Sequence, residues 1–479
     1  MRVLFVASEA NPFIKSGGLG DVVGALPKAL AQKGVDIRVV IPKYKELNWE
    51  VKDKLRFNKW FNVKVGWRDQ FCGVWECFYN GVTYYALDNE RYFNRDEMYG
   101  FYDDGERFAF FDRAVLDMLR QIDWQPDLIH CNDWQTGMLP VLLKFQYKRN
   151  DMFYWNMKCV YSIHNIAFQG IFDPTILPEL FDFDMELYDN TCLKFDEGVS
   201  FMKGGLYYSD IITTVSNSYA AEIQTSEYGQ RLDGVLRDRS YALRGIVNGI
   251  DYDEFNPKTD RFIYKNYDVN SIKNKVVNKT SLQQELGLAV DENIPMIAMV
   301  TRLTHQKGLD LLVDISDRLL QQNVQLVILG TGDSHYEDHF KWLDYKYGNK
   351  VSVNIRFDNA LANKIYAASD MFLMPSLFEP CGLGQLIALR YGSIPIVRET
   401  GGLKDTVTAY NEYTWEGNGF SFTNYNADEL YNILQYALWI YQDKKRWNNL
   451  IEHAMNSDNS WNRSAQIYLD MYRELTHQY

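Results

Sequence analysis

Cysteine, long apolar runs and clusters of positive charge are all scarce in this sequence of 479 residues. The six cysteines are scattered and none forms a C-x-x-C pair, so neither a disulfide framework nor a zinc site is expected. No apolar run reaches the roughly 18 residues that a membrane-spanning helix needs. The formal net charge is -13 without a long basic run, which argues against nucleic acid as a partner.

No leader segment is expected from the residues at the start of the sequence. Met1 is followed directly by an apolar run that is typical of a buried strand, with no basic or Arg/Ser-rich stretch ahead of it. We therefore expect a cytoplasmic protein that has no membrane partner.

Short apolar runs alternate with helical patterns through both halves, which is typical of parallel βαβ units. The strands expected in the first half are Val3–Ser8, Ile37–Ile41, Leu128–Cys131, Val160–Ile163 and Ile211–Val215, with helices at Asp21–Gln32 and Gly137–Tyr147. Those of the second half are Met296–Val300, Gln325–Leu329, Val351–Ile355, Met371–Met374 and Ile394–Val397. An aromatic-rich stretch from about Phe57 to Tyr102 interrupts this rhythm and is expected to be an inserted set of antiparallel strands and loops.

The length exceeds the size at which one hydrophobic core stops growing, so two domains are expected. The repeated alternation predicts the α/β class, with two Rossmann-like, doubly wound domains facing a cleft. We place the first domain at residues 1–250. The second domain covers 251–459, and an amphipathic helix at about 460–479 is expected to return to the first domain.

A glycine-rich turn over Lys15–Asp21 (KSGGLGD) leads from the first expected strand into its helix. Glycines at such a turn let the backbone approach a phosphate or sugar, and the helix N-terminus supplies N–H donors. Lys15 could reach a phosphate as a point charge. The turn is not a Walker A loop, because no Gly-Lys-Ser/Thr follows, and Gly24 comes one residue late for a dinucleotide fingerprint. Taken alone, it also fits a purely structural role.

The second half carries two comparable loops. The segment 301–308 (TRLTHQKG) places Arg302 at the end of a strand and Lys307 at the start of a helix. Two cations there suit a diphosphate leaving group, although a solvated pair on a loop is also consistent. The segment 375–384 (PSLFEPCGLG) puts Glu379 near a helix N-terminus. Its carboxylate could accept hydrogen bonds from sugar hydroxyls or only cap the helix.

Taken together, these motifs resemble those of bacterial glycogen synthases and plant starch synthases, which form glycosyltransferase family 5. The resemblance rests on the three loops and is supported by His164-Asn165, by 247–251 (VNGID) and by 400–403 (TGGL). It implies the GT-B fold and a retaining enzyme without a cofactor. The implied reaction moves glucose from ADP-glucose to the non-reducing 4-hydroxyl of an α-1,4-glucan such as glycogen, starch or maltooligosaccharides.

The resemblance also implies roles for individual residues. Lys15, Arg302 and Lys307 would contact the donor diphosphate. His164 would lie at the glucosyl unit, Glu379 would bind glucose hydroxyls, and Asp133 would line the active site. Substrate-binding positions would be Gly18, Asp21, Asn248, Phe357, Cys381, Gly382, Leu383, Gly401 and Gly402. Among these, Gly18 would offer its amide to the phosphates, Asn248 would reach the glucose and Phe357 would lie against adenine.

Three positions depart from the family pattern. Asn132 stands where the family often has a second histidine ahead of Asp133. Gly384 stands where many members have threonine, which removes a hydroxyl near the donor phosphates. Phe255 replaces the usual tryptophan.

The resemblance favours same-face substitution, with a leaving phosphate oxygen taking the proton of the acceptor hydroxyl. We predict no metal, although Asp-x-Asp occurs at Asp182–Asp184 and at Asp251–Asp253. Two alternatives remain open, namely another GT-B glucosyltransferase of the sucrose-linked or trehalose-linked kind, and a catalytically silent glucan-binding homologue. The sequence leaves the oligomeric state open.

Overall fold

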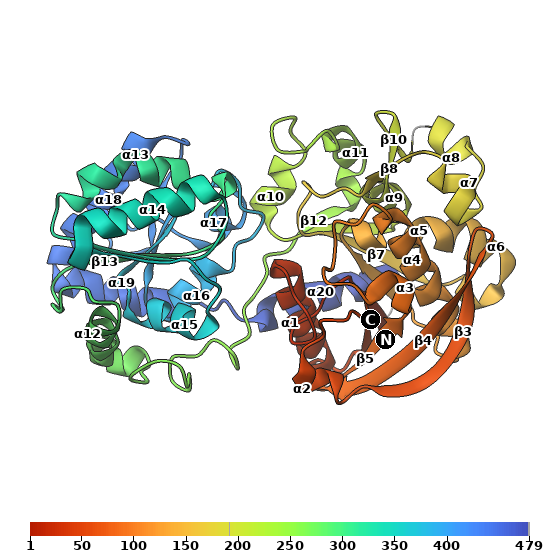
Figure 1. Ribbon diagram of the computed structural model, residues 1–479, viewed down its shortest axis with the longest axis horizontal. Coiled ribbons are helices and arrows are strands. Elements are labelled where there is room, and N and C mark those ends of the chain that lie inside the picture. The colour runs from red at the N-terminus through yellow and green to blue at the C-terminus, as the bar shows by residue number, and fades with distance from the viewer. Residues whose placement is uncertain (191, 478–479) are drawn as a thin grey trace. The chain divides into compact units, whose positions relative to one another are not determined.

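The computed structural model describes residues 1–190 and 192–477, and the chain divides into two compact units (Figure 1). The first unit comprises residues 1–246 with the terminal segment from Trp461, and the second runs from Val247 to Ser460. The division falls four residues before the expected position at 250, so Asn248 belongs to the second unit. Of the terminal helix expected at about 460–479, residues 478–479 lie outside the described residues.

The first unit is built on a nine-stranded sheet in the order β12-β11-β7-β6-β1-β2-β5-β4-β3. From β12 through β5 all neighbouring strands are parallel. The strands are β1 Arg2–Val6, β2 Asp36–Pro42, β3 Arg56–Val65, β4 Arg68–Tyr79, β5 Val82–Asp88, β6 Leu128–Asn132, β7 Lys158–Ile163, β11 Ile211–Thr214 and β12 Leu243–Gly245. A small second sheet contains β8 Ile171–Phe172, β9 Lys194–Phe195 and β10 Gly198–Ser200.

The aromatic-rich stretch forms β3, β4 and β5, which pair antiparallel with one another. It is not a separate insertion, however, because β5 also pairs in parallel with β2 and so continues the main sheet. Alternation of buried and exposed residues along β3 fits an edge strand with one solvated face. The nearly continuous burial of β5 fits a strand covered on both faces.

Helices cover the faces of this sheet (Figure 1). They are α1 Gly18–Gln32, α2 Trp49–Lys52, α3 Glu90–Phe93, α4 Asp104–Gln121, α5 Leu139–Leu142, α6 Lys148–Asn150, α7 Ile176–Phe181, α8 Glu186–Asp189, α9 Phe201–Tyr208, α10 Asn217–Glu222 and α11 Asp233–Asp238. The single helix expected over Gly137–Tyr147 is instead α5 followed by a π-helical turn, Leu143–Tyr147. Pro140 stands in the first turn of α5, where its missing N–H costs nothing.

The terminal helix α20, Trp461–Thr476, packs against α1 within the first unit (Figure 1). Its buried residues join the core formed by β1, β2 and α1. The hydroxyl of Tyr472 in α20 lies 2.5 Å from Nδ1 of His130, a fully buried residue of β6. The terminal helix is therefore tied to the central strands by a polar contact as well as by apolar packing.

The second unit has a six-stranded, all-parallel sheet in the order β15-β14-β13-β16-β17-β18. Its strands are β13 Met296–Val300, β14 Gln325–Leu329, β15 Val351–Asn354, β16 Met371–Met374, β17 Ile394–Arg398 and β18 Phe420–Phe422. Its helices are α12 Lys275–Glu285, α13 Leu309–Leu320, α14 Ser334–Tyr347, α15 Asn359–Ala368, α16 Gly384–Arg390, α17 Gly401–Thr406, α18 Ala427–Gln442 and α19 Lys444–Asn456. The expected α/β class with two doubly wound units is confirmed. Within the described residues, no helix is both long and apolar enough to cross a membrane.

The bond between Tyr472 and His130 yields a stability prediction. Tyr472→Phe leaves a buried imidazole nitrogen without its partner, and we expect it to cost about 1–3 kcal/mol. The matched control is Tyr102→Phe, because Tyr102 is 98% exposed. Thermal unfolding should show a lower midpoint for Tyr472→Phe alone. Equal midpoints for the two variants would show that the contact does not stabilise the unit.

Candidate functional site

Three strands of the first unit end at the same edge of its sheet. Strand β1 pairs in parallel with β6, and β6 pairs in parallel with β7. Glu9 and Asp133 follow β1 and β6, and His164 follows β7 directly. The chain leaves β1 toward β2 on one side, whereas β6 lies on the other side. This is a topological switch point, where ligands bind in open α/β sheets.

Glu9 holds the glycine-rich turn in place, a role that sequence reasoning missed. Its buried carboxylate accepts hydrogen bonds from the backbone N–H of Ser16, at 2.5 Å, and from the Ser16 hydroxyl, at 3.0 Å. Burial raises the pKa of Glu9, while the bonds from Ser16 oppose that rise. The turn lies close against the start of α1, because a Cβ at Gly20 would come within 2.4 Å of the Cβ of Lys15. The one available signal was an acidic residue just beyond a buried strand.

The predicted residues of this turn lie together at its surface. Nζ of Lys15 is 2.8 Å from Oδ1 of Asp21 in the first turn of α1. Gly18, the first residue of α1, is exposed. The turn therefore offers a cation and the N-terminus of a 15-residue helix at one place, which suits an anionic ligand.

Asp133 has a strained backbone at the end of β6. Its φ of 56° and ψ of -177° lie in a region that is essentially confined to glycine and costs about 1–3 kcal/mol. Its Oδ1 accepts hydrogen bonds from the backbone N–H groups of His164, at 2.7 Å, and Asn165, at 3.4 Å. Burial raises the pKa of Asp133 to about 7. The two hydrogen bonds act in the opposite direction and lower the pKa, whereas the nearby charge of Glu9 raises it further. The carboxyl is thus set to exchange a proton near neutral pH.

His164 is held beside Asp133 in a neutral state. Its Nε2 lies 2.8 Å from Oδ1 of Asn132, the last residue of β6. Burial lowers the pKa of His164 to about 3, so the imidazole is uncharged at neutral pH. The structure therefore brings the predicted residues Asp133 and His164 together, and it adds Asn132 to them.

In the second unit, Lys307 and Glu379 form a pair at the corresponding edge of the sheet. Strand β13 pairs in parallel with β16, and the two loops follow these strands. Nζ of Lys307 is 2.6 Å from Oε2 of Glu379, which also accepts a hydrogen bond from the hydroxyl of Ser376 at 3.1 Å. Both members of the pair are largely buried. A buried ion pair with a further hydrogen bond keeps both charges in a fixed geometry.

Main-chain contacts fix the Glu379 loop on both sides. Leu377 donates from its backbone N–H to the carbonyl of Gln306 at 2.9 Å, and Arg398 donates to the carbonyl of Leu377 at 2.7 Å. On the other side lies Gly401, with a φ of 47°, where a Cβ would come within 1.9 Å of the carbonyl oxygen of Glu379. Only glycine fits this approach, which explains the Gly-Gly start of α17.

The other predicted positions of the second unit are partly buried and partly exposed. Arg302, after β13, is exposed, and its side chain has no hydrogen bond or ion pair with another described residue. Asn248 is buried, and its Oδ1 has no partner among the described residues. Cys381 is buried and accepts a hydrogen bond from the backbone of Asn248, and burial raises the pKa of its thiol to about 12, which excludes a thiolate. Phe357, after β15, is 81% exposed.

The remaining glycines and Leu383 stay in the same loops. Gly382 and Leu383 precede α16, and Gly402 donates its backbone N–H to the carbonyl of Glu379 at 3.1 Å. Gly384 begins α16, and a Cβ there would come within 3.1 Å of the ring of Phe372. The missing threonine side chain would therefore need Phe372 to shift.

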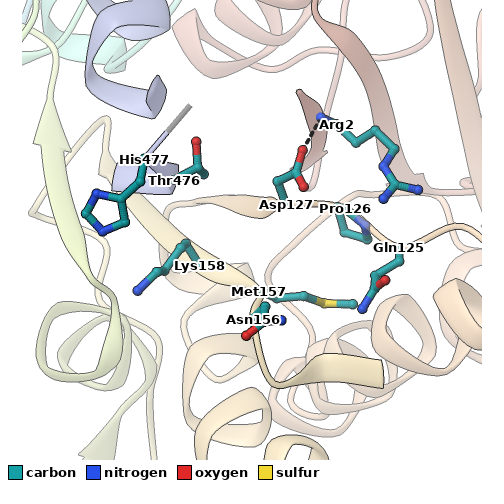
Figure 2. Close-up of a pocket in the computed structure, with 9 residues that line it drawn as sticks. All are labelled: Arg2, Gln125, Pro126, Asp127, Asn156, Met157, Lys158, Thr476 and His477. Carbon is teal, nitrogen blue, oxygen red and sulfur yellow. Dashed lines mark hydrogen bonds between the residues drawn. The ribbon is translucent and has the colours of Figure 1, made fainter. Parts of the chain in front are cut away.

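A polar pocket lies at the opposite edge of the first sheet (Figure 2). Arg2 and Lys158 begin β1 and β7, and Asp127 immediately precedes β6 and accepts a hydrogen bond from the backbone of Arg2 at 2.7 Å. None of the predicted site residues lines this pocket. Among residues 1–190 and 192–477, no group of three or more His, Cys, Asp or Glu side chains could hold a metal ion.

Comparison with known proteins gives consistent matches over both units. A family model described as the starch synthase catalytic domain matches residues 2–238, and one described as glycosyl transferases group 1 matches residues 280–455. The chain is 85% identical over 478 residues to a glycogen synthase of Clostridium beijerinckii, covering 100% of both chains. It is 63% identical to one of Clostridium perfringens, covering 99% of this chain and 98% of the other.

Two solved structures extend the comparison. The catalytic domain of starch synthase IV from Arabidopsis thaliana, bound to ADP and acarbose, matches with a TM-score of 0.92 and 33% identity, covering 99% of both chains. A sucrose-phosphate synthase from Thermosynechococcus elongatus matches with a TM-score of 0.63 and 16% identity over 100% of both chains, which concerns the fold alone.

The raised pKa of Asp133 predicts a pH-dependent stability effect. Between about pH 4 and 7 the folded protein keeps a proton that the unfolded chain releases, so this group's contribution to the unfolding free energy falls as pH rises. In Asp133→Asn the side chain does not titrate, so this loss of unfolding free energy does not occur. The amide oxygen can still accept the hydrogen bond from the backbone N–H of His164. Relative to wild type, the variant should gain roughly 1–4 kcal/mol of stability between pH 5 and 8. Thermal unfolding across this range measures it, and a constant difference would contradict the raised pKa.

The close approach at Gly401 gives a second prediction. Gly401→Ala must displace the carbonyl of Glu379, whereas Gly348→Ala, at a φ of 48°, meets nothing within 4 Å. Both substitutions place an alanine at a positive φ, where an L side chain is strained whatever the space around it. Only Gly401→Ala should also speed hydrogen exchange in peptides covering residues 375–384. Equal exchange in the two variants would show that Gly401 does not fix this loop.

Proposed function

Because the chain belongs to the glycogen synthase and starch synthase family of glycosyltransferases, we propose that it transfers glucose from ADP-glucose to the 4-hydroxyl at the non-reducing end of an α-1,4-glucan. The configuration at the glucose C1 is retained. The observation that carries this proposal is the full-length similarity to bacterial glycogen synthases. We also assign the reaction to the cytoplasm.

The acceptor and donor roles follow the two units. Residues 1–246 with the terminal helix form the acceptor and catalytic domain, and 247–460 form the nucleotide-sugar-binding domain. Support for the second role comes from Arg302, whose unpaired guanidinium is available to a diphosphate, and from Lys307. Phe357, being exposed, is available to stack on adenine.

We assign sugar recognition to side-chain oxygens that can accept hydrogen bonds from sugar hydroxyls. Glu379 pairs with Lys307 and keeps Oε1 for a sugar hydroxyl, since its bonds to Lys307 and Ser376 both use Oε2. Asn248 supplies its unpartnered Oδ1. Within the first unit, Asp133 orients the main chain at His164, which we place against the glucosyl unit.

In the proposed reaction, the bond between C1 of glucose and the diphosphate oxygen breaks while a bond from C1 to the acceptor O4 forms on the same face. The departing phosphate oxygen takes the proton of the 4-hydroxyl, so ADP leaves. Lys15, Arg302 and Lys307 neutralise the charge that develops on the diphosphate. Catalysis rests on positioning and on this charge stabilisation.

The direct experiment measures glucose incorporation into glycogen from ADP-glucose and from UDP-glucose, each with and without EDTA. We expect ADP-glucose to be preferred and EDTA to have no effect. Preference for UDP-glucose would keep the reaction but overturn the role of Phe357. Glycogen binding without transfer from either donor would instead identify a catalytically silent homologue.

Arg302→Ala gives the sharpest variant test of the diphosphate assignment. The side chain has no hydrogen bond or ion pair with another described residue, so a loss of activity at unchanged thermal stability reports on the ligand. We expect kcat/KM for ADP-glucose to fall about 10²–10³-fold, as for loss of one charge-stabilising donor. The control Arg318→Ala removes a partly exposed pair with Asp428 and a cation–π contact with Tyr431 on the same unit, and its kcat/KM should match wild type. Unchanged kcat/KM in Arg302→Ala would contradict the assignment.

A further inference from the structure

The amide of Asn132 has a single orientation that its neighbours fix. The residue is fully buried at the end of β6, and its Nδ2 donates to the carbonyl of Val6 at 2.9 Å and to that of His130 at 3.3 Å. Carbonyl oxygens only accept hydrogen bonds, so the NH2 side of the amide must face them. Oδ1 of Asn132 therefore faces Nε2 of His164.

This orientation decides which ring nitrogen of His164 carries the proton. Oδ1 of an amide is only an acceptor, so Nε2 must be the donor across the 2.8 Å contact. In a neutral imidazole the other nitrogen, Nδ1, is then an acceptor. The structure gives Nδ1 no partner among the described residues.

The charged and titratable surroundings favour the neutral ring. Asp133 follows β6 and spends Oδ1 on backbone N–H groups at His164 and Asn165 rather than on the imidazole. Glu9, beyond β1, accepts a hydrogen bond from the backbone N–H of Ser16. His130, within β6, is bonded to Tyr472 and Ser162, and burial keeps its pKa well below the usual value. On β11, the strand on the other side of β7, Thr214 donates its hydroxyl to the carbonyl of Ile163 at 2.8 Å.

We propose that Asn132 is a positioning residue that holds His164 as the Nε2–H tautomer, so that Nδ1 accepts a hydrogen bond from a hydroxyl of the glucosyl donor. This inference rests on the proposed function. The residue at position 132 must therefore donate one hydrogen bond to the carbonyl of Val6 and accept one from His164. A neutral imidazole also has one of each, so histidine satisfies the same requirement.

The tautomer can be read directly by long-range ¹H–¹⁵N correlation on ¹⁵N-histidine-labelled enzyme. The chain has seven histidines, and His164→Gln assigns the signal. We expect a pyrrole-like Nε2 and a pyridine-like Nδ1 in the wild type from pH 5 to 8. Protonation of Nδ1 in the wild type at neutral pH would overturn the proposal.

Three variants separate positioning from structural support. Asn132→Leu should mix the tautomers and lower kcat about 10–100-fold, as loss of a group that orients a functional histidine does at metal sites, with little change in KM. Asn132→His should restore the tautomer and kcat. The control Thr136→Val removes buried bonds to the backbone of Asn132 and Asp133 but none to His164, and should keep both the tautomer and kcat.

Each outcome decides the matter. A wild-type tautomer in Asn132→Leu, or an equal loss of kcat in Asn132→Leu and Thr136→Val at matched thermal stability, would overturn the role of Asn132. The spectrum needs no substrate, so it reports on Asn132 even if the wild type transfers no glucose. That last result would contradict the proposed function instead.

Discussion

Parallel strand pairing at two switch points is the constraint on which the rest of the structure depends. In the first unit β1 lies between β2 and β6, and in the second β13 lies between β14 and β16. Parallel neighbours end at the same edge, so loops far apart in sequence are brought together there. Glu9, Asp133 and His164 meet in this way in one unit, and Lys307 meets Glu379 across 72 positions in the other.

The loops at these edges are held mainly by hydrogen bonds to backbone groups. Glu9 bonds to Ser16, Asp133 bonds to the backbone at His164, and Gly401 lies against the carbonyl of Glu379. Lys15 and Lys307 are each paired with a carboxylate, whereas the Arg302 side chain has no hydrogen bond or ion pair with another described residue. The proposed diphosphate site therefore needs only a few local cations and backbone donors in a chain whose net charge is -13.

The sequence predicted the central strands well because buried parallel strands appear as short apolar runs. The strands Met296–Val300, Gln325–Leu329 and Met371–Met374 have the predicted bounds. The short strands β12 and β18 were missed, since three residues give no periodic signal. The helix expected over Gly137–Tyr147 is present from Leu139, but its π turn at Leu143–Tyr147 was not predicted, because such a turn depends on packing rather than on composition.

The residues of the candidate site could be predicted only where they belong to a recognisable motif. The glycine-rich turn and the loops at Arg302 and Glu379 have distinctive spacing, so their residues could be named in advance. Glu9 could not, because its role is a bond to the backbone of Ser16. Asn132 was noticed only as a departure from the family pattern, since its amide orientation depends on carbonyls of Val6 and His130.

The anomeric configuration of the first linkage formed tests the account most directly. ADP-glucose labelled with ¹³C at C1 is given to the enzyme with a short maltooligosaccharide, and the product is followed by NMR from the earliest time. The account predicts an α-1,4 linkage with one ADP released for each glucose transferred. A β linkage, or ADP release without a new glycosidic bond, would contradict it.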